Sequence, residues 1–226
     1  MCGRYSLIMT IGELQNRFEF DGERLGYAPA YNVAPTQNVL TVVGDEARRA
    51  GYMRWGLIPF WAKDKTIGSR MINARAETVA EKPSFRTALR RRRCLVLADG
   101  FYEWQRTGKN KRPMRIVMRS GEPFAFAGLW ETWKDPEGTV IPSCTIITTT
   151  PNDLLKPIHD RMPVILSREV EDFWLDDSVD DPAALTSVLN PYPNDEMEVY
   201  EVSSLVNSVA NKGPEVLAPV AENANG

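Results

Sequence analysis

Short segments in which apolar residues alternate with polar ones, or follow one another directly, recur along most of the chain and predict strands. Two of them, residues 38–43 and 47–55, flank a loop that contains Gly44, which predicts a hairpin. The other predicted strands are residues 3–9, 94–97, 101–105, 113–119, 124–130, 144–149, 163–166 and 198–202. Strands therefore dominate the predicted structure.

Helical periodicity is rarer, and it follows recognisable start signals. Thr10 and Glu13 form the Thr-x-x-Glu pattern of a capping box, which predicts a short helix after the first strand. Ser167 and Asp181 are N-cap residues for two further helices, and Pro182 occupies the first turn of the second. These two helices are predicted over residues 168–175 and 182–189, and one more helix is predicted over residues 84–92.

These elements predict an α+β fold built on a curved, mostly antiparallel β-sheet with a few short helices. The acidic segment 176–181 is too short to separate two domains. We therefore expect one domain over residues 1–217, followed by a small, polar and mobile tail at 218–226.

Composition narrows the chemistry that the chain can perform. Of its 226 residues, 43% are hydrophobic and 25% charged, as in an ordinary folded domain. It has one histidine, His159, and three cysteines, Cys2, Cys94 and Cys144, without a Cys-x-x-Cys pair. A zinc site with several histidines is thereby excluded, and we expect neither a metal nor a cofactor. The odd cysteine count and the lack of an apolar run of about 18 residues predict a cytoplasmic protein that is not in a membrane.

The formal net charge of -3 conceals an unequal distribution of charge. Residues 1–119 hold 22 Lys and Arg against 11 Asp and Glu, whereas residues 120–226 hold 5 against 19. A basic half is typical of a protein that meets phosphates. The alternative is that folding interleaves the two halves and cancels the field, and the sequence leaves both interpretations open.

Cys2 has a chemical capacity that depends on its position. Removal of Met1, which is usual before a small residue, would give Cys2 a free α-amine beside its thiol. Such a 1,2-aminothiol condenses with an aldehyde through the amine, and the thiolate then closes a five-membered thiazolidine ring. The alternative is an unremarkable residue at the start of a chain.

Three further segments carry groups suited to catalysis or binding. Asn73 and Arg75 combine an orienting amide with a guanidinium that can hold a phosphate, although Arg75 could instead pair with Glu77 in an exposed loop. Glu103 lies between aromatic residues, which raises a carboxyl pKa and suits proton transfer, unless it is an ordinary strand-edge carboxylate. His159 lies in a proline-bounded loop, where it is either catalytic or structural.

Basic residues gather in two clusters with aromatic residues nearby. They are Arg86 with residues 90–93, then Lys109, Lys111, Arg112, Arg115 and Arg119, while Trp55, Phe60 and Trp61 precede Lys63 and Lys65. Arginines interspersed with aromatics suit single-stranded nucleic acid, because bases stack and phosphates pair with cations. Residues 90–93 could equally be a solvated helix end that the helix dipole favours.

Seven motifs occurring together in this order resemble the SOS-response-associated peptidase family, also described as abasic-site processing proteins. They are MCGRY at 1–5, YNVAP at 31–35, WGLIP at 55–59, INARAET at 72–78, ADGFYEW at 98–104, IHDRMP at 158–163 and VANKG at 209–213. The resemblance covers almost the whole chain. It implies the family's own α+β fold and a role in the DNA damage response.

The resemblance also implies a substrate. It implies a monomer, nucleoid-associated when bound, that binds single-stranded DNA and single-strand/duplex junctions and captures abasic sites there. The ring-opened sugar of an abasic site is an aldehyde, so Cys2 would join it as a thiazolidine and shield the lesion.

Roles for the other site residues follow from the same resemblance. Asn73 would position the amine and the sugar, Glu103 would move protons, and His159 would act as acid or base at the sugar oxygens. The remaining family positions are phosphate-binding Arg4, Arg75 and Arg161, base-packing Pro35 and Trp61, and the pocket-lining Thr148.

Two alternative functions stay open at this point. The family's peptidase name implies that Cys2, assisted by Glu103 or His159, attacks a peptide bond, including the one that follows Met1. A non-covalent binder of single strands would use the basic half alone, and its binding would weaken with salt.

Overall fold

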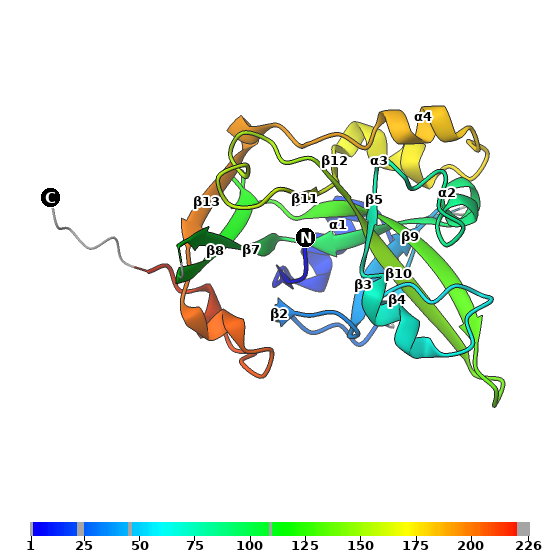
Figure 1. Cartoon of the computed structure of the whole chain (residues 1–226), viewed down its shortest axis with the longest axis horizontal. Helices are drawn as coiled ribbons and strands as arrows, with labels where there is room; N and C mark the ends of the chain where they lie inside the picture. The colour runs from blue at the N-terminus through cyan, green and yellow to red at the C-terminus, as the bar shows by residue number, and fades with distance from the viewer. Residues whose placement is uncertain (1, 22–24, 45–46, 109, 221–226) are drawn as a thin grey trace, which may run out of the picture.

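The computed structural model describes residues 2–21, 25–44, 47–108 and 110–220, and strands form most of it (Figure 1). Met1, Lys109, loop residues 45–46 and tail residues 221–226, which enter the expectations above, lie outside the described residues. Among the described residues, no helix is long and apolar enough to cross a membrane.

Five strands close into a barrel at the centre of the molecule. They are β3 (Asn38–Val43), β4 (Arg49–Trp55), β6 (Arg93–Ala98), β9 (Phe124–Lys134) and β10 (Val140–Thr149). Their pairing runs β10-β4-β3-β6-β9 and returns to β10, so no edge is left open in the ring. The β10–β4 pair is parallel, and the other four pairs are antiparallel.

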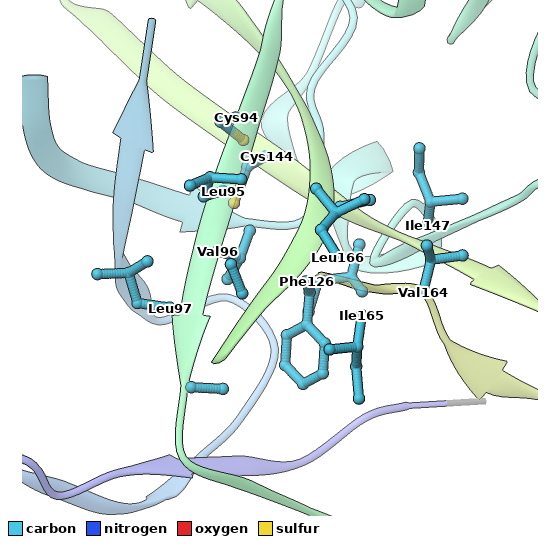
Figure 2. Close-up of a cluster of buried hydrophobic side chains, with 14 of the residues drawn as sticks. Cys94, Leu95, Val96, Leu97, Phe126, Cys144, Ile147, Val164, Ile165 and Leu166 are labelled. Carbon is cyan, nitrogen blue, oxygen red and sulfur yellow. The ribbon is translucent and has the colours of Figure 1, made fainter. Parts of the chain in front are cut away.

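Three short strands extend the barrel at the ends of β9 and β10. Strand β5 (Asn73–Arg75) pairs in parallel with β10, with Asn73 opposite Ile146 and Arg75 opposite Thr148. Strand β11 (Met162–Pro163) pairs with β10, and β12 (Ile165–Leu166) pairs with β9. Figure 2 shows Val164, Ile165 and Leu166, at and beside β12, among buried apolar side chains of the barrel strands.

A second sheet of five antiparallel strands lies beside the barrel, in the order β13-β8-β7-β1-β2. Its members are β1 (Tyr5–Leu7), β2 (Ala30–Val33), β7 (Gly100–Thr107), β8 (Asn110–Met118) and β13 (Met197–Glu201). Figure 1 shows β7, β8 and β13 extending away from the barrel toward the C-terminal segment. The chain passes from barrel strand β6 into β7 through Asp99 alone, so the two sheets are continuous at that point.

Helices are short and lie outside the barrel. Helix α1 (Ile11–Phe18) begins at Thr10, whose hydroxyl accepts the backbone N–H of Glu13 while the Glu13 carboxylate accepts that of Thr10. The other helical segments are α2 (Arg86–Arg91), α3 (Arg168–Leu175), α4 (Pro182–Ser187), and the 3₁₀ turns η1 (Lys65–Arg70), η2 (Asn194–Glu196), η3 (Ser204–Asn207) and η4 (Pro214–Leu217).

An aromatic cluster joins the two sheets in the core. Tyr5 of β1 lies 5.3 Å from the Trp55 ring and 5.7 Å from the Phe126 ring, measured between centroids. Phe101 of β7 is 6.0 Å from Phe126 and 6.5 Å from Phe124. These tilted and edge-on contacts bury large apolar surfaces, so they fix β1, and with it the start of the chain, against the barrel.

The expected α+β fold with a mostly antiparallel, barrel-like sheet is confirmed. Two strands are additional to the sequence prediction, β2 and β5, and residues 163–166 divide between β11 and β12. The start of the predicted tail is paired, because Ser203 donates its N–H to Ala218 and Val220 donates its N–H to Glu201.

The charged halves of the chain are partly interleaved. Ion pairs join the basic half to the acidic half at Arg17–Glu171, Arg48–Asp172, Arg91–Asp180, Arg92–Glu131 and Arg112–Glu201. The predicted cluster at 90–93 is therefore not one DNA-facing patch. Within it, Arg93 is 5% exposed and donates to carbonyls of α2 and to those of Trp174 and Asp176 at the end of α3.

Candidate active site

The start of the chain is fixed by a buried carboxylate. Asp99, between β6 and β7, accepts the Ser6 hydroxyl at 2.7 Å and the backbone N–H groups of Ile8 and Met9. Arg115 of β8 approaches the same carboxylate at 3.3 Å. Gly100 permits this approach, because a Cβ there would lie 2.9 Å from Arg115 Nη2. Strand β1 is thus held along its length, and Cys2 precedes it by three residues.

Cys2 is fully buried, three residues ahead of this strand. Burial raises the pKa of its thiol, and the nearby Glu103 carboxylate raises it further. A hydrogen bond from the Arg4 backbone N–H acts in the opposite direction. The thiol is therefore protonated near neutral pH.

Glu103 is the carboxylate whose charge acts on the Cys2 thiol. It lies on β7, is 3% exposed, and has its pKa raised to about 7, chiefly by burial and further by the Asp160 carboxylate. Its position follows from strand alternation, because Phe101 on the same face packs into the barrel core. A carboxyl with a pKa near 7 exists in both protonation states at neutral pH.

Glu103 and His159 line one pocket of about 390 Å³. The other residues in its wall are Trp104, Arg106, Lys111, Ile158 and Asp160. Glu103 comes from the second sheet, whereas His159 comes from the loop between barrel strand β10 and the short strand β11 that pairs with it. The pocket therefore forms where the two sheets meet.

His159 is held as a neutral imidazole near pH 7, because burial lowers its pKa. Its Nδ1 accepts the Arg161 backbone N–H at 3.0 Å, which leaves the ring proton on Nε2. Asp160 Oδ1 lies 2.9 Å from the same Nδ1, and that contact becomes an ion pair only when the ring is protonated. His159 can thus accept or donate a proton. When its ring is protonated, the Asp160 carboxylate pairs with it.

Asn73 lies on β5, one of the two strands that the sequence left unpredicted. Its Nδ2 donates to Ile146 at 3.4 Å. Its Oδ1 is buried without a hydrogen-bond partner among the described residues. A buried amide oxygen without a partner is costly, so it is a ready acceptor for a donor brought by a ligand or by the amine of the chain.

Three residues expected near phosphates or in the pocket gather at the junction of β5, β10 and β11. Thr148 is fully buried and lies opposite Arg75 on one side and Pro163 on the other. Arg161 donates to the Thr148 carbonyl at 2.6 Å and to both carboxylate oxygens of Glu77. Arg75 is exposed and makes no ion pair with another described residue, so Glu77 pairs with Arg161 rather than with Arg75.

Arg4 is directed into the protein. Its Nη1 donates to Asn32 Oδ1 at 2.8 Å and to the Val206 carbonyl at 2.6 Å. Its guanidinium lies 5.7 Å from the centre of the Trp104 ring. The motif at 31–35 therefore serves, through Asn32, to tie the C-terminal segment to the first strand, since Asn32 Nδ2 also donates to Ser208 and Asn211.

Pro35 and Trp61 lie outside the Glu103–His159 pocket. Pro35 is half-buried in the turn after β2. Trp61 is 50% exposed and lines a separate pocket of about 500 Å³, together with Lys63 and Arg70. The structure therefore does not bring all the expected DNA-binding residues into one cavity.

Sequence reasoning missed several residues that shape the pocket. Trp104 forms its wall, with Lys111 Nζ 5.3 Å from the ring centre and the indole N–H donating to Asn207 Oδ1 at 2.6 Å. Arg106 also lines it. Strand alternation carried part of this signal, because Trp104 and Arg106 share a face of β7.

Among the described residues, no group of three or more His, Cys, Asp or Glu side chains is arranged to hold a metal ion. What the site does contain is a buried thiol at the chain start, a carboxyl that titrates near neutrality and a neutral imidazole. The fold and this pocket define a β-barrel protein with a candidate nucleophile at its N-terminus.

A family model described as SOS response associated peptidase matches residues 1–209. Because the match spans most of the sequence, the chain belongs to this family, as the motifs led us to expect. A crystal structure of a protein from Bacteroides thetaiotaomicron has the same fold, with a TM-score of 0.87 at 28% identity over 97% of this chain and 100% of that one.

Similar curated proteins carry a functional name. The abasic site processing protein YoqW of Bacillus subtilis (strain 168) is 54% identical over 96% of this chain and 99% of its own length. The abasic site processing protein HMCES of Pongo abelii is 36% identical over 86% of this chain and 66% of its own length.

Proposed function

We propose that this protein processes abasic sites in single-stranded DNA by joining them covalently to Cys2 after Met1 has been removed. The observation that carries the proposal is the burial of Cys2 beside Glu103, whose pKa is raised to about 7, in the same part of the molecule as the His159 pocket. The names of the similar proteins support the choice of substrate.

The reaction consumes the aldehyde of the ring-opened sugar. The α-amine of Cys2 attacks the aldehyde carbon, and loss of one water gives an imine. The Cys2 sulfur then adds to the imine carbon while the nitrogen takes up a proton, which closes a thiazolidine ring. An ammonium on Cys2 itself, left by Met1 removal, would lower the pKa of the neighbouring thiol and so oppose the effect of burial.

Glu103 supplies protons at the step that needs them. In its protonated form it donates to the hydroxyl that leaves as water, and in its ionised form it accepts the proton of the amine or the thiol. A pKa of about 7 makes both forms available at neutral pH. His159, neutral under the same conditions, serves the sugar oxygens from the other wall of the pocket.

Asn73 is assigned a positioning role. Its buried Oδ1 lacks a partner among the described residues and is suited to accept an N–H from the Cys2 amine or an O–H from the sugar. A phosphate backbone leaving the pocket would meet the exposed guanidinium of Arg75 and the ammonium of Lys111. Trp61, half-exposed beside Lys63, offers a base a stacking surface further away.

A peptidase function has less support. Thiol attack on a peptide bond requires a thiolate, and with Met1 in place burial and Glu103 both raise the pKa of Cys2. The Asp160–His159 contact is also made through Nδ1, which already accepts the Arg161 N–H in the neutral ring. We therefore assign Cys2 to aldehyde capture.

The test is a denaturing gel of the Met1-free protein incubated with an abasic single strand. We expect a band that survives denaturation with the native chain and with Cys94→Ala, because Cys94 lies in the barrel core. Cys2→Ala should give no such band. A chain with one alanine inserted before Cys2 keeps the thiol but blocks its amine, and it should also fail to react. A stable adduct with either altered chain would refute the proposal.

A further inference from the structure

Glu77 and Arg161 form a two-pronged ion pair beside the site. Arg161 Nη1 donates to Glu77 Oε1 at 2.6 Å, and Nη2 donates to Oε2 at 2.9 Å. This parallel geometry is the most directional that an arginine can make with a carboxylate. Arg161 is 13% exposed at its side chain and Glu77 is 47% exposed. The guanidinium is therefore held inside the protein, and the carboxylate closes over it from the surface.

The same guanidinium is fixed to the end of β10. Arg161 Nη2 donates to the Thr148 carbonyl at 2.6 Å, and that carbonyl also accepts the Ala76 N–H at 2.8 Å. Thr148 lies opposite Arg75 of β5 and Pro163 of β11. Three segments that are distant in sequence, near residues 75, 148 and 161, thus meet at one buried residue.

Two of these segments carry a group of the candidate site. Asn73 lies two residues before Arg75 on β5. His159 lies two residues before Arg161 and receives its backbone N–H at Nδ1. The Glu77 carboxylate follows β5 and pairs with the residue that orients His159, so it bridges the strand of Asn73 and the loop of His159.

We propose that Glu77 is a positioning residue, whose ion pair with Arg161 clamps the His159 loop onto the β5–β10 edge and so fixes His159 and Asn73 relative to Cys2. The inference deepens the proposed function and rests on it for its kinetic effect. It assigns Glu77 no contact with DNA and no role in proton transfer.

The exposure of Glu77 separates positioning from stability. An ion pair whose carboxylate is half-exposed contributes little to folding, because solvent screens it and side-chain entropy opposes it. Misplacing a reacting group by about 1 Å, in contrast, costs on the order of 100-fold in rate. Replacement of Glu77 is therefore expected to leave the fold intact and to slow the chemistry.

The experiment compares Glu77→Gln with Asp180→Asn. Asp180 is 49% exposed and pairs with Arg91 away from the pocket, so it is a matched control. The rate of adduct formation is measured over a range of abasic single-strand concentrations. We expect Glu77→Gln to lower the maximal rate by about 10- to 100-fold, with the half-saturating concentration within about twofold of the native value. Asp180→Asn should match the native protein, and Glu77→Asp should recover part of the rate.

A second readout does not depend on DNA. The chain has a single histidine, so an untagged sample gives one imidazole titration by NMR. Asp160 and Arg106 act on that imidazole through their charges and Arg161 acts through its backbone N–H, while Glu103 and Lys111 line the same pocket. Glu77→Gln leaves the charge of Arg161 uncompensated and its segment less constrained, so the titration midpoint of His159 should fall by at least a few tenths of a pH unit. Asp180→Asn should not move it.

Two results would overturn the clamp. An unchanged maximal rate together with an unchanged His159 titration would mean that the ion pair positions nothing. An unchanged maximal rate with tighter binding would mean that Glu77 competes with DNA phosphate for Arg161. If the native protein forms no adduct, the proposed function fails, while the His159 titration still decides whether Glu77 orients the loop.

Discussion

The surroundings of Cys2 at the chain start and the barrel interior around Cys94 and Cys144 hold thiols that are equally buried. All three side chains are fully inaccessible, and burial raises the pKa of each thiol. Figure 2 shows Cys94 and Cys144 among aliphatic side chains of the barrel. Cys2, in contrast, has the Glu103 carboxyl within electrostatic reach.

The difference shows that burial by itself does not mark a reactive thiol. A thiol surrounded by hydrocarbon has no group to take its proton, so Cys94 and Cys144 fill space in the core. A thiol at a chain start, next to a carboxyl that titrates near pH 7, has both a proton acceptor and a neighbouring amine once Met1 is removed. Chemistry follows from the polar neighbours and the chain position.

The largest effect is expected at the carboxyl that distinguishes the two regions. Glu103→Gln keeps the size and shape of the side chain but cannot exchange protons. The rate of adduct formation should fall by about 10²- to 10⁴-fold, which is the usual contribution of general acid–base catalysis. The pH–rate profile should also lose its inflection near pH 7. An unaltered profile in the variant would show that another group carries the proton.

The same carboxyl should make the stability of the protein depend on pH. Its pKa rises from 4.5 to about 7 on folding, so the folded state binds more protons between these values. Stability contributed by this group is present below about pH 4.5 and is lost as the pH rises through 7, by about 3 kcal/mol. Chemical denaturation at several pH values should show this slope, and Glu103→Gln should remove it. An equal slope in both proteins would contradict the raised pKa.

The barrel core around Cys94 is tested by a substitution that adds a methyl group to it. A Cβ at Gly128 of β9 would lie 2.7 Å from Cys94 Sγ, within a barrel wall that cannot give way easily. Gly128→Ala should therefore lower the free energy of unfolding by about 1–3 kcal/mol. Adduct formation by the folded fraction should proceed at the native rate, because the change is confined to the core. A slowed reaction in fully folded protein would link the core to the site.

The smallest effect is expected at the surface. Asp180→Asn breaks an exposed ion pair with Arg91, so it should change stability by less than about 1 kcal/mol. Because Arg91 belongs to the basic cluster at residues 90–93, the variant also tests that cluster. We expect the salt dependence of single-strand binding to be unchanged, which fluorescence anisotropy can measure. A marked rise in affinity would indicate that these arginines belong to the DNA-binding surface.

Local sequence signals predicted the elements whose determinants are local. The capping box of Thr10 and Glu13 placed α1, and the apolar run before the Gly44 loop placed β3 with its observed bounds. Strand β5 escaped prediction because Asn73 and Arg75 are polar, and only pairing with Ile146 and distant β10 makes the segment a strand. Such pairing across about seventy residues leaves no periodic pattern in the sequence.

The sequence predicted which residues belong to the candidate site, but not which hydrogen bonds and ion pairs connect them. The motifs identified Cys2, Glu103 and His159, which the structure brings to one region. Arg161 carried a phosphate-binding expectation, yet in the free protein its guanidinium is occupied by Glu77 and Thr148. These partners lie 84 and 13 residues away, so no short motif could indicate them.

The most direct test of the central claim is the intact mass of the Met1-free protein after reaction with an abasic single strand, before and after borohydride treatment. The account predicts the sum of the two masses less one water, unchanged by borohydride, because a thiazolidine has no imine left to reduce. The Cys2→Ala protein should show its own mass only. A product that gains two hydrogens on treatment, or an adduct that forms without Cys2, would contradict thiazolidine capture by the N-terminal cysteine.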